Sequence, residues 1–197
     1  MKKGLLIALI VAGVGILAVM WGLGKYNGIV KLDEGINEGW AQVQNQYQRR
    51  MDLIPNLVAT VQGVANFEKT TLQAVIEARA KATQVTLSPQ LLNDPAAFQK
   101  FEQSQGQVSS SLSRLLVTVE QYPNLKANEN FLQLQSQLEG TENRIAVERK
   151  RFNEVVLNYN SHIRQVPTNI IASFGGFQAK QYFQAQADAE TALKVQF

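Results

Sequence analysis

The chain has 197 residues, enough for one domain with a single core after its apolar N-terminal segment. It contains no cysteine, which excludes a disulfide framework and a thiolate metal site. The net charge is +3, but Lys2, Lys3 and Lys25 flank the apolar segment, and the other 16 of the 19 basic residues balance 16 acidic ones. Because the domain itself is neutral, it has no basic stripe for a phosphate backbone, and nucleic acid is not an expected partner.

The first predicted element is a transmembrane helix over residues 4–24. These 21 residues carry no charge, and as a helix they extend for about 30 Å, the thickness of the hydrocarbon core of a bilayer. A cleaved secretory signal is the alternative, but its apolar region is usually shorter, about 7–15 residues, and a small-residue cleavage site follows it. We therefore expect residues 1–25 to be an uncleaved membrane anchor, with Trp21 and Tyr26 at the interface.

Small residues recur at four-residue intervals within this segment, first at Gly4, Ala8 and Ala12 and then at Ala18 and Gly22. Such spacing lets the helices of neighbouring copies approach closely, so these positions are candidates for packing between membrane helices. The alternative is that they have no packing role, since small residues are common in any membrane helix.

The charges on the two sides of the segment predict its orientation. Lys2, Lys3 and the amino terminus precede it, whereas Lys25 and Lys31 follow it. The positive-inside rule therefore favours a cytoplasmic N-terminus with the following domain on the outer side.

Residues 26–174 are predicted to form one antiparallel helical bundle. Beyond Tyr26, apolar residues recur at helical spacing at Ile29, Ile36, Trp40, Val43 and Tyr47. Pro55 must kink or briefly break this helix. The same spacing resumes after the proline at Leu57, Val61, Val64, Leu72 and Val75. We therefore expect one rod that continues past Pro55.

A tight connection is predicted over residues 86–95, where turn-forming residues cluster. Asp94 is a good N-cap, and Pro95 suits the first position of the next helix. That helix carries an apolar stripe from Phe98 until Pro123.

A fourth stripe runs from about Asn128, a second candidate cap, to Pro167. Strand signals are absent from the sequence. The predicted fold is therefore all-α, with an N-terminal transmembrane helix, an elongated antiparallel bundle of about four helices and a short C-terminal amphipathic tail.

Several polar residues interrupt or adjoin the apolar stripes, namely Glu68, Arg79, Glu142, Asn143 and Arg144. Buried charges must be paired or hydrogen-bonded, so one hypothesis is an internal polar network formed by these residues. The alternative is that a modest rotation of the helices leaves them on solvated edges.

The sequence indicates no catalytic, cofactor or metal site. His162 has no second histidine at ligand spacing and is interpreted as an ordinary bundle residue. The glycine pair at Gly175 and Gly176 lacks the lysine and strand of a phosphate-binding loop. We therefore expect a protein without enzymatic activity and without a cofactor.

Residues 175–197 lie outside the bundle pattern. A short amphipathic helix is predicted from the apolar residues Phe177, Tyr182, Phe183, Ala187 and Leu193, and it would dock on a neighbour or on the membrane. A frayed terminus is the alternative.

Several motifs together resemble those of the LemA family. They are RRMDLIPNLV at 49–58, YPNLKANENF at 122–131, TENRIA at 141–146, and the pairs Phe152-Asn153 and Tyr159-Asn160. The resemblance covers residues 1–178 and implies a bacterial membrane protein with an antiparallel helical bundle and no established biochemical activity. It also implies a short N-terminus outside the cell, which is opposite to the orientation that the charges favour. Phe152 stands where the family more often has tyrosine.

The functional prediction is a non-enzymatic, single-pass scaffold or interaction protein of the bacterial cytoplasmic membrane. Its expected partners are the membrane, other copies of itself and other envelope membrane proteins. The alternative is an envelope sensor or small-ligand-binding bundle. We favour the scaffold because a transmitting sensor normally needs a second span or an output domain, and neither is seen in these residues.

Overall fold

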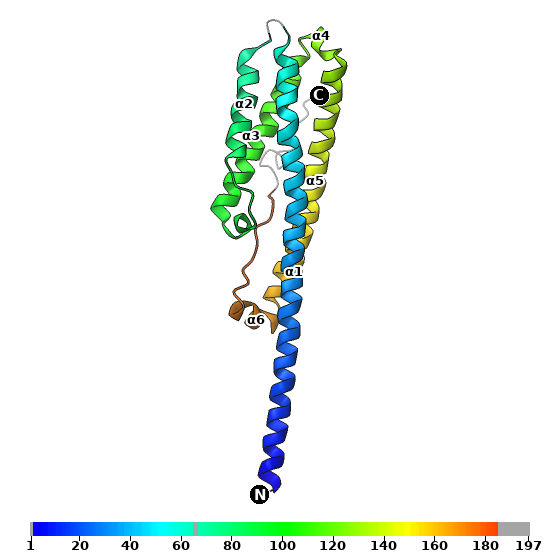
Figure 1. The fold of residues 1–197 in the computed structure, drawn as a ribbon. Helices are drawn as coiled ribbons and strands as arrows, with labels where there is room; N and C mark the ends of the chain where they lie inside the picture. Colours follow the sequence, from blue (N-terminus) through cyan, green and yellow to red (C-terminus); the bar gives the residue numbers. More distant parts are fainter. Residues whose placement is uncertain (1, 65–66, 185–197) are drawn as a thin grey trace, which may run out of the picture.

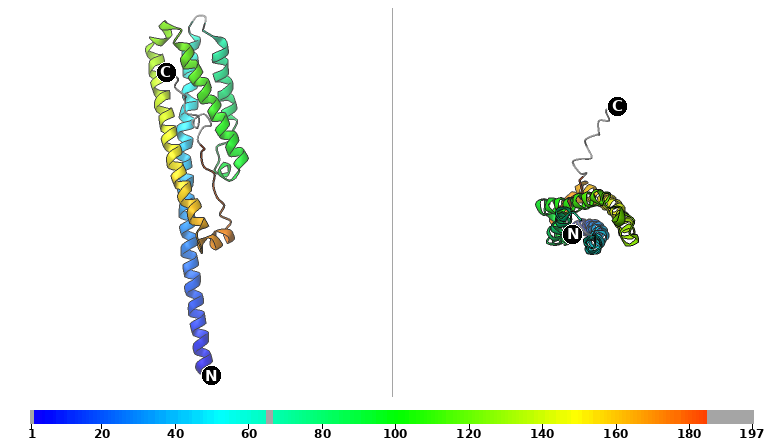
Figure 2. Two further views of the ribbon diagram at one scale, coloured as in Figure 1. Left: turned by 180° about the vertical axis from the view of Figure 1, so that it is seen from behind. Right: turned by 90° about the horizontal axis from the view of Figure 1, so that it is seen from above.

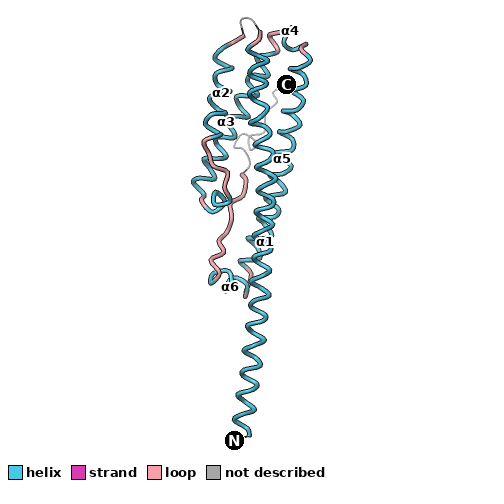
Figure 3. Tube along the Cα trace, in the orientation of Figure 1, coloured by secondary structure: helices cyan, strands magenta, loops and turns pink. Residues whose placement is uncertain are grey.

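The computed structural model describes residues 2–64 and 67–184. Within these ranges every regular element is a helix, as the sequence predicted (Figure 3). The elements are α1 (Lys2–Gln62), α2 (Lys69–Thr83), the 3-10 helix η1 (Pro89–Asn93), α3 (Pro95–Val119), α4 (Pro123–Lys126), α5 (Glu129–Arg164) and α6 (Thr168–Phe174).

Helix α1 joins two different environments without a break. Its first part projects from the bundle (Figure 1), and the side chains over residues 4–21 are exposed. Burial begins at Ile29 and continues through Trp40 to Val61. Of the described residues, those of α1 form the helix that is long and apolar enough to cross a membrane.

The bundle consists of two helix pairs. Helix α1 packs along α5, α2 packs along α3, and α1 also contacts α2. Helix α5 runs back toward the projecting part of α1. The short helix α6 follows it and lies beside the base of the bundle, in contact with α1 and α5 (Figure 1). Residues 177–184 then run as an extended segment up the side of the bundle between α3 and α5 (Figure 2). We call this segment the strap.

The buried apolar residues form two clusters along the bundle. The distal cluster lies far from the projecting helix and includes Met51, Val108 and Leu138. The proximal cluster is built around Trp40 and Phe101 and also contains Ile145 and Phe183. Arg50 lies between Tyr47 of the proximal cluster and Met51 of the distal cluster. It binds Gln105, Ser109 and Glu142, and we call these four residues the polar layer, which separates the two clusters.

One expectation about the helices was wrong in detail. The rod does not continue to Val75, because α1 ends at Gln62 and a turn starting at Gly63 leads to α2. The helix does continue past Pro55 as expected, and the proline lies inside α1 with its ring exposed and not at a break. The apolar spacing misled because it happens to continue on α2 with the same period.

The expected tail helix does not form over the described residues. Phe177, Tyr182 and Phe183 belong to the extended strap, while Ala187 and Leu193 lie outside the described residues. Backbone groups of Lys180 and Phe183 bind side chains of α5, and the Gln181 N–H donates to the Leu92 carbonyl, so these groups have partners outside the strap and do not form helical hydrogen bonds.

Candidate functional site

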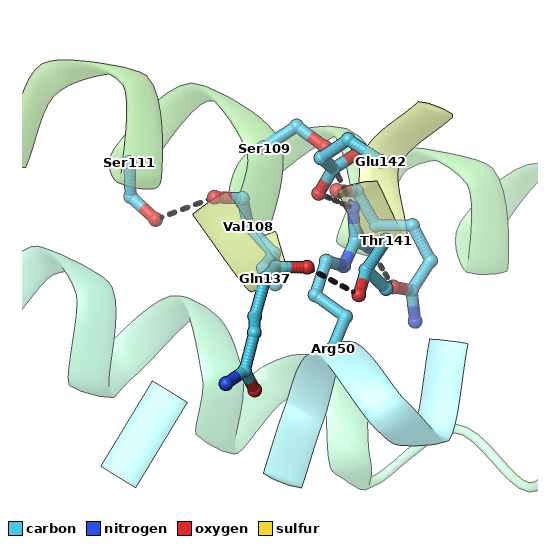
Figure 4. A network of polar contacts seen from close by, with 8 residues as sticks. Arg50, Val108, Ser109, Ser111, Gln137, Thr141 and Glu142 are labelled. Carbon is cyan, nitrogen blue, oxygen red and sulfur yellow. Dashed lines mark hydrogen bonds and ion pairs between the residues drawn. The ribbon is translucent and has the colours of Figure 1, made fainter. Parts of the chain in front are cut away.

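The polar layer is centred on Arg50 of α1, whose side chain is 1% exposed. Its Nη1 donates to Glu142 Oε1 of α5 at 2.7 Å and to Ser109 Oγ of α3 at 2.8 Å. Its Nη2 donates to the side-chain oxygen of Gln105 (Figure 4 shows the surroundings). The guanidinium carbon lies 5.1 Å from the centre of the Tyr47 ring. One buried cation therefore ties together three helices, α1, α3 and α5.

A broad, open pocket of about 1190 Å³ adjoins this layer, with walls from α1, α2, α3 and α5. Glu102 and Arg149 line it and form an ion pair at 3.2 Å across the gap between α3 and α5. Burial raises the pKa of Glu102, although the N–H of Gln184 and the charge of Arg149 partly oppose that rise. Burial likewise raises the pKa of Tyr47. The pocket therefore offers both charges and hydrogen-bond donors to a polar molecule.

The strap is held by two asparagines of α5. Asn160 donates from Nδ2 to the Lys180 carbonyl at 3.0 Å and accepts from the Lys180 N–H at 2.9 Å. Asn153 makes the same pair of bonds with Phe183, both at 2.9 Å. The two asparagines are seven residues apart on a helix, a distance of about 10 Å along its axis. Lys180 and Phe183 are three residues apart on an extended chain, which also spans about 10 Å, so each asparagine lies opposite its partner.

Phe183 is the apolar anchor of the strap. Its ring stacks on that of Trp40, with centroids 6.1 Å apart at 27°, and it also packs on Phe98 and Phe152. The guanidinium of Arg149 lies 4.6 Å from the ring centre on the outer side. The strap thus completes the proximal core, and its last residue, Gln184, lines the pocket.

Residues 39–197 match the sequence profile of the LemA family. The chain belongs to the LemA family. Relatives include magnetosome protein MamQ 2 of Paramagnetospirillum magneticum, which is 25% identical over 185 residues covering 86% of this chain and 68% of the relative. Magnetosome protein MamQ of Magnetospirillum gryphiswaldense is 26% identical with the same coverage. Protein LemA of Metamycoplasma hominis is 23% identical over 171 residues, 87% of this chain and 74% of the relative.

Four of the five sequence motifs that resemble the LemA family coincide with the two polar features of the structure. The motif at 49–58 contains Arg50, and the motif at 141–146 contains its partner Glu142. The pairs at 152–153 and 159–160 each place an aromatic ring in the core beside an asparagine that binds the strap. Together with the apolar part of α1, family membership indicates a membrane-associated protein.

The polar network predicted from the sequence has different members in this LemA-family structure. Glu142 belongs to it, whereas Glu68, Asn143 and Arg144 are exposed. Arg79 instead donates from Nε to the Met51 carbonyl at 3.0 Å. The prediction failed for the exposed residues because spacing along one helix does not determine how that helix is rotated against its neighbours.

Arg50, Gln105 and Ser109 are the network members that the sequence analysis missed. A signal for Arg50 was present, because it lies three residues after Tyr47 and four before Ile54, on the apolar stripe of its helix. A charged residue at a stripe position indicates a buried charge, and a buried charge needs a partner.

The predicted caps and breaks occupy helix ends, except for Pro55. The Asp94 carboxylate accepts from the N–H groups of Ala96 and Ala97, with Pro95 in the first position of α3. Asn128 Oδ1 accepts from the Phe131 N–H at the start of α5. Pro123 begins α4, and Pro167 precedes α6.

The remaining predicted residues are His162 and the small residues of the apolar segment. Within residues 2–64 and 67–184, no group of three or more His, Cys, Asp or Glu could hold a metal ion. His162 lies beside Gly28, where a Cβ added to the glycine would be 4.0 Å from its Nε2. In the apolar segment, a Cβ added at Gly4 or Gly22 would meet no atom within 4 Å, so the small-residue face is uncovered in a single chain.

Proposed function

We propose that the protein is a non-enzymatic, membrane-anchored scaffold of the bacterial cell envelope that associates with copies of itself through its span and bundle faces. The observation that carries this proposal is the continuity of α1, which is one helix from Lys2 to Gln62. The apolar part and the bundle cannot swivel at a flexible joint, so packing between spans also positions the bundles. The names of the relatives, magnetosome protein and protein LemA, name no reaction.

Two faces support self-association. In the apolar segment, Gly4, Ala8 and Ala12 lie on one side of the helix, where small side chains permit close helix contact. On the bundle, Val147 and Leu157 are large apolar side chains that α5 exposes to solvent.

The test is the mass of the full-length protein in a mild detergent, combined with energy transfer between labelled copies in vesicles. Leucine at positions 8 and 12 (Ala8→Leu with Ala12→Leu) fills the small-residue face and should reduce association. Val11→Leu enlarges a neighbouring exposed position and is the matched control. A strictly monomeric wild type in both measurements would contradict the scaffold.

We further propose that the bundle lies on the outer side of the cytoplasmic membrane, because Lys2 and Lys3 precede the span. The chain has no cysteine, so in a Val117→Cys variant a maleimide can label position 117 alone. In intact cells stripped of any outer barrier, a membrane-impermeant maleimide should label this position. Labelling only after the cells are lysed would place the bundle in the cytoplasm.

A second candidate function, binding of a small polar ligand, is favoured by the open pocket beside Arg50. Arg149 and Glu102 would supply charge at its edge, and Gln105 and Ser109 would supply hydrogen bonds. Arg149→Met should then abolish the thermal stabilisation that a screened polar compound produces. A compound that stabilises the variant equally well is not bound in this pocket.

A further inference from the structure

Helix α6 and the residue pair before it expose an apolar face. Val166, Ile170 and Phe174 are 81%, 54% and 90% exposed, and they follow one another at intervals of four residues. Thr168 and Ala172, between them, are each 3% exposed and pack on the bundle. Ile170 and Phe174 lie on one side of α6, because they are four residues apart in that helix, and Thr168 and Ala172 turn the opposite side to the bundle. The exposed Val166 lies in the turn directly before α6.

Helix α6 lies at the level where α1 leaves the bundle (Figure 1). Gly175, directly after α6, sits so close to α1 that an added Cβ would come within 3.1 Å of the Tyr26 ring. Phe177 packs on the same ring, with centroids 5.4 Å apart. Tyr26 is two residues beyond the apolar segment, a rise of only about 3 Å along the helix axis.

The surroundings of this face are those of a membrane interface. On α1, Lys25 lies with its Nζ 5.9 Å from the centre of the Trp21 ring, a pairing of aromatic and basic residues typical of the boundary between lipid and water. Arg164, at the end of α5, is exposed and adds a second cation close to α6. Exposing large apolar side chains to water is unfavourable in free energy, and here they are exposed next to the expected position of the bilayer surface.

We propose that α6 is a second membrane contact, which inserts Val166, Ile170 and Phe174 into the interfacial layer of the bilayer that α1 crosses. The proposal rests on the membrane anchoring of the proposed function and adds a lipid-binding surface to it. A helix that lies in the interface buries its apolar side at the boundary of headgroups and acyl chains. With two contacts, at α1 and at α6, the bundle is held at one tilt and one rotation relative to the membrane, and its outward faces are the same in every copy.

Single cysteines in the full-length chain test this assignment, because the natural chain has none. Phe174→Cys and Ile170→Cys are labelled with an environment-sensitive fluorophore, and the protein is reconstituted into phosphatidylcholine vesicles with or without nitroxide-bearing lipid. Val117→Cys is the matched control, since Val117 is also apolar and 70% exposed but lies at the other end of the bundle, near α4. Val14→Cys reports on the span.

The expected result is blue-shifted emission and quenching by the lipid nitroxides at positions 170 and 174, strong quenching at position 14, and neither effect at 117. Quenching at 14 with a water-exposed label at 174 would overturn the α6 contact and leave the anchor intact. A blue shift at 174 without lipid quenching would assign the face to a second protein copy and also overturn the proposal. Loss of quenching at 14 would overturn the anchor, and the α6 contact with it.

Discussion

Arg79 of α2 donates a hydrogen bond to the one backbone carbonyl that Pro55 of α1 leaves without a helical partner. In a regular helix the Met51 carbonyl would accept from the N–H of residue 55, but proline has no N–H. Arg79 Nε donates to this carbonyl at 3.0 Å instead. The proline therefore does not end α1, because a side chain of the adjacent helix replaces the missing bond.

This pairing predicts a measurable coupling between the two residues. Arg79→Met should lower the free energy of unfolding by about 1–3 kcal/mol, because it leaves the Met51 carbonyl unsatisfied. In a Pro55→Ala background the new N–H can donate to that carbonyl, so Arg79→Met should lower the free energy of unfolding by less. The coupling energy between the two substitutions should exceed about 0.5 kcal/mol. Urea unfolding of the four proteins measures it. Lys81→Met, on the exposed side of α2, is the control, and strictly additive costs would refute the pairing.

Glu142→Leu should destabilise the protein, because it leaves the buried charge of Arg50 without its counter-ion. The expected loss is about 2–3 kcal/mol, less than for a fully buried pair, since the Glu142 side chain is 38% exposed to water. Adding Arg50→Met should restore part of the loss, because both charges are then gone. Glu154→Leu, an exposed acid on the same helix, serves as control. A melting temperature that rises in Glu142→Leu would show that the polar layer is dispensable.

Asn160→Asp should release the strap. The carboxylate loses the Nδ2 donor and places an acceptor against the Lys180 carbonyl, so a pair of hydrogen bonds becomes one bond and one repulsion. Trypsin should then cleave after Lys180 faster than in the wild type, and hydrogen exchange of the strap amides should increase. The same change at Asn158, which is exposed on α5, should leave both rates as they are. Equal protection in the two variants would mean that the strap is held without the Asn160 hydrogen bonds.

Stability should fall at alkaline pH through Tyr159. Burial, with a smaller effect of the Asp33 charge, raises the pKa of Tyr159 from 10.0 to about 12. A raised pKa means that the fold favours the neutral phenol, so its contribution is complete below pH 10 and is lost as the pH rises toward 12. Urea midpoints across this range should decline less steeply in Tyr159→Phe than in the wild type. Tyr182→Phe, more exposed on the strap, should follow the wild-type curve. Tyr159→Phe should also lose about 0.5–1.5 kcal/mol at neutral pH, because its hydroxyl donates to the Gln178 carbonyl at 3.1 Å.

The candidate site could be predicted only in part. Glu142 was found because a charge interrupts an apolar stripe, and the same rule applied to α1 would have found Arg50. Ser109 and Gln105 could not be found this way, since serine and glutamine are as common on solvated faces as in polar layers. Their role depends on which turn of α3 faces Arg50, and the long-range packing of α3 against α1 decides that.

Most of the helices of this protein were predictable from local features of the sequence. An uncharged segment of bilayer length, apolar residues at helical spacing and the caps at Asp94 and Asn128 are local features, and local hydrogen bonding and burial suffice to produce helices from them. Long-range contacts determined that Pro55 would stay inside a helix, that Arg50 would bind Glu142, and that the strap would be extended rather than helical. In each case the deciding partner comes from a distant part of the chain, and the period of one segment carries no information about the partner it meets.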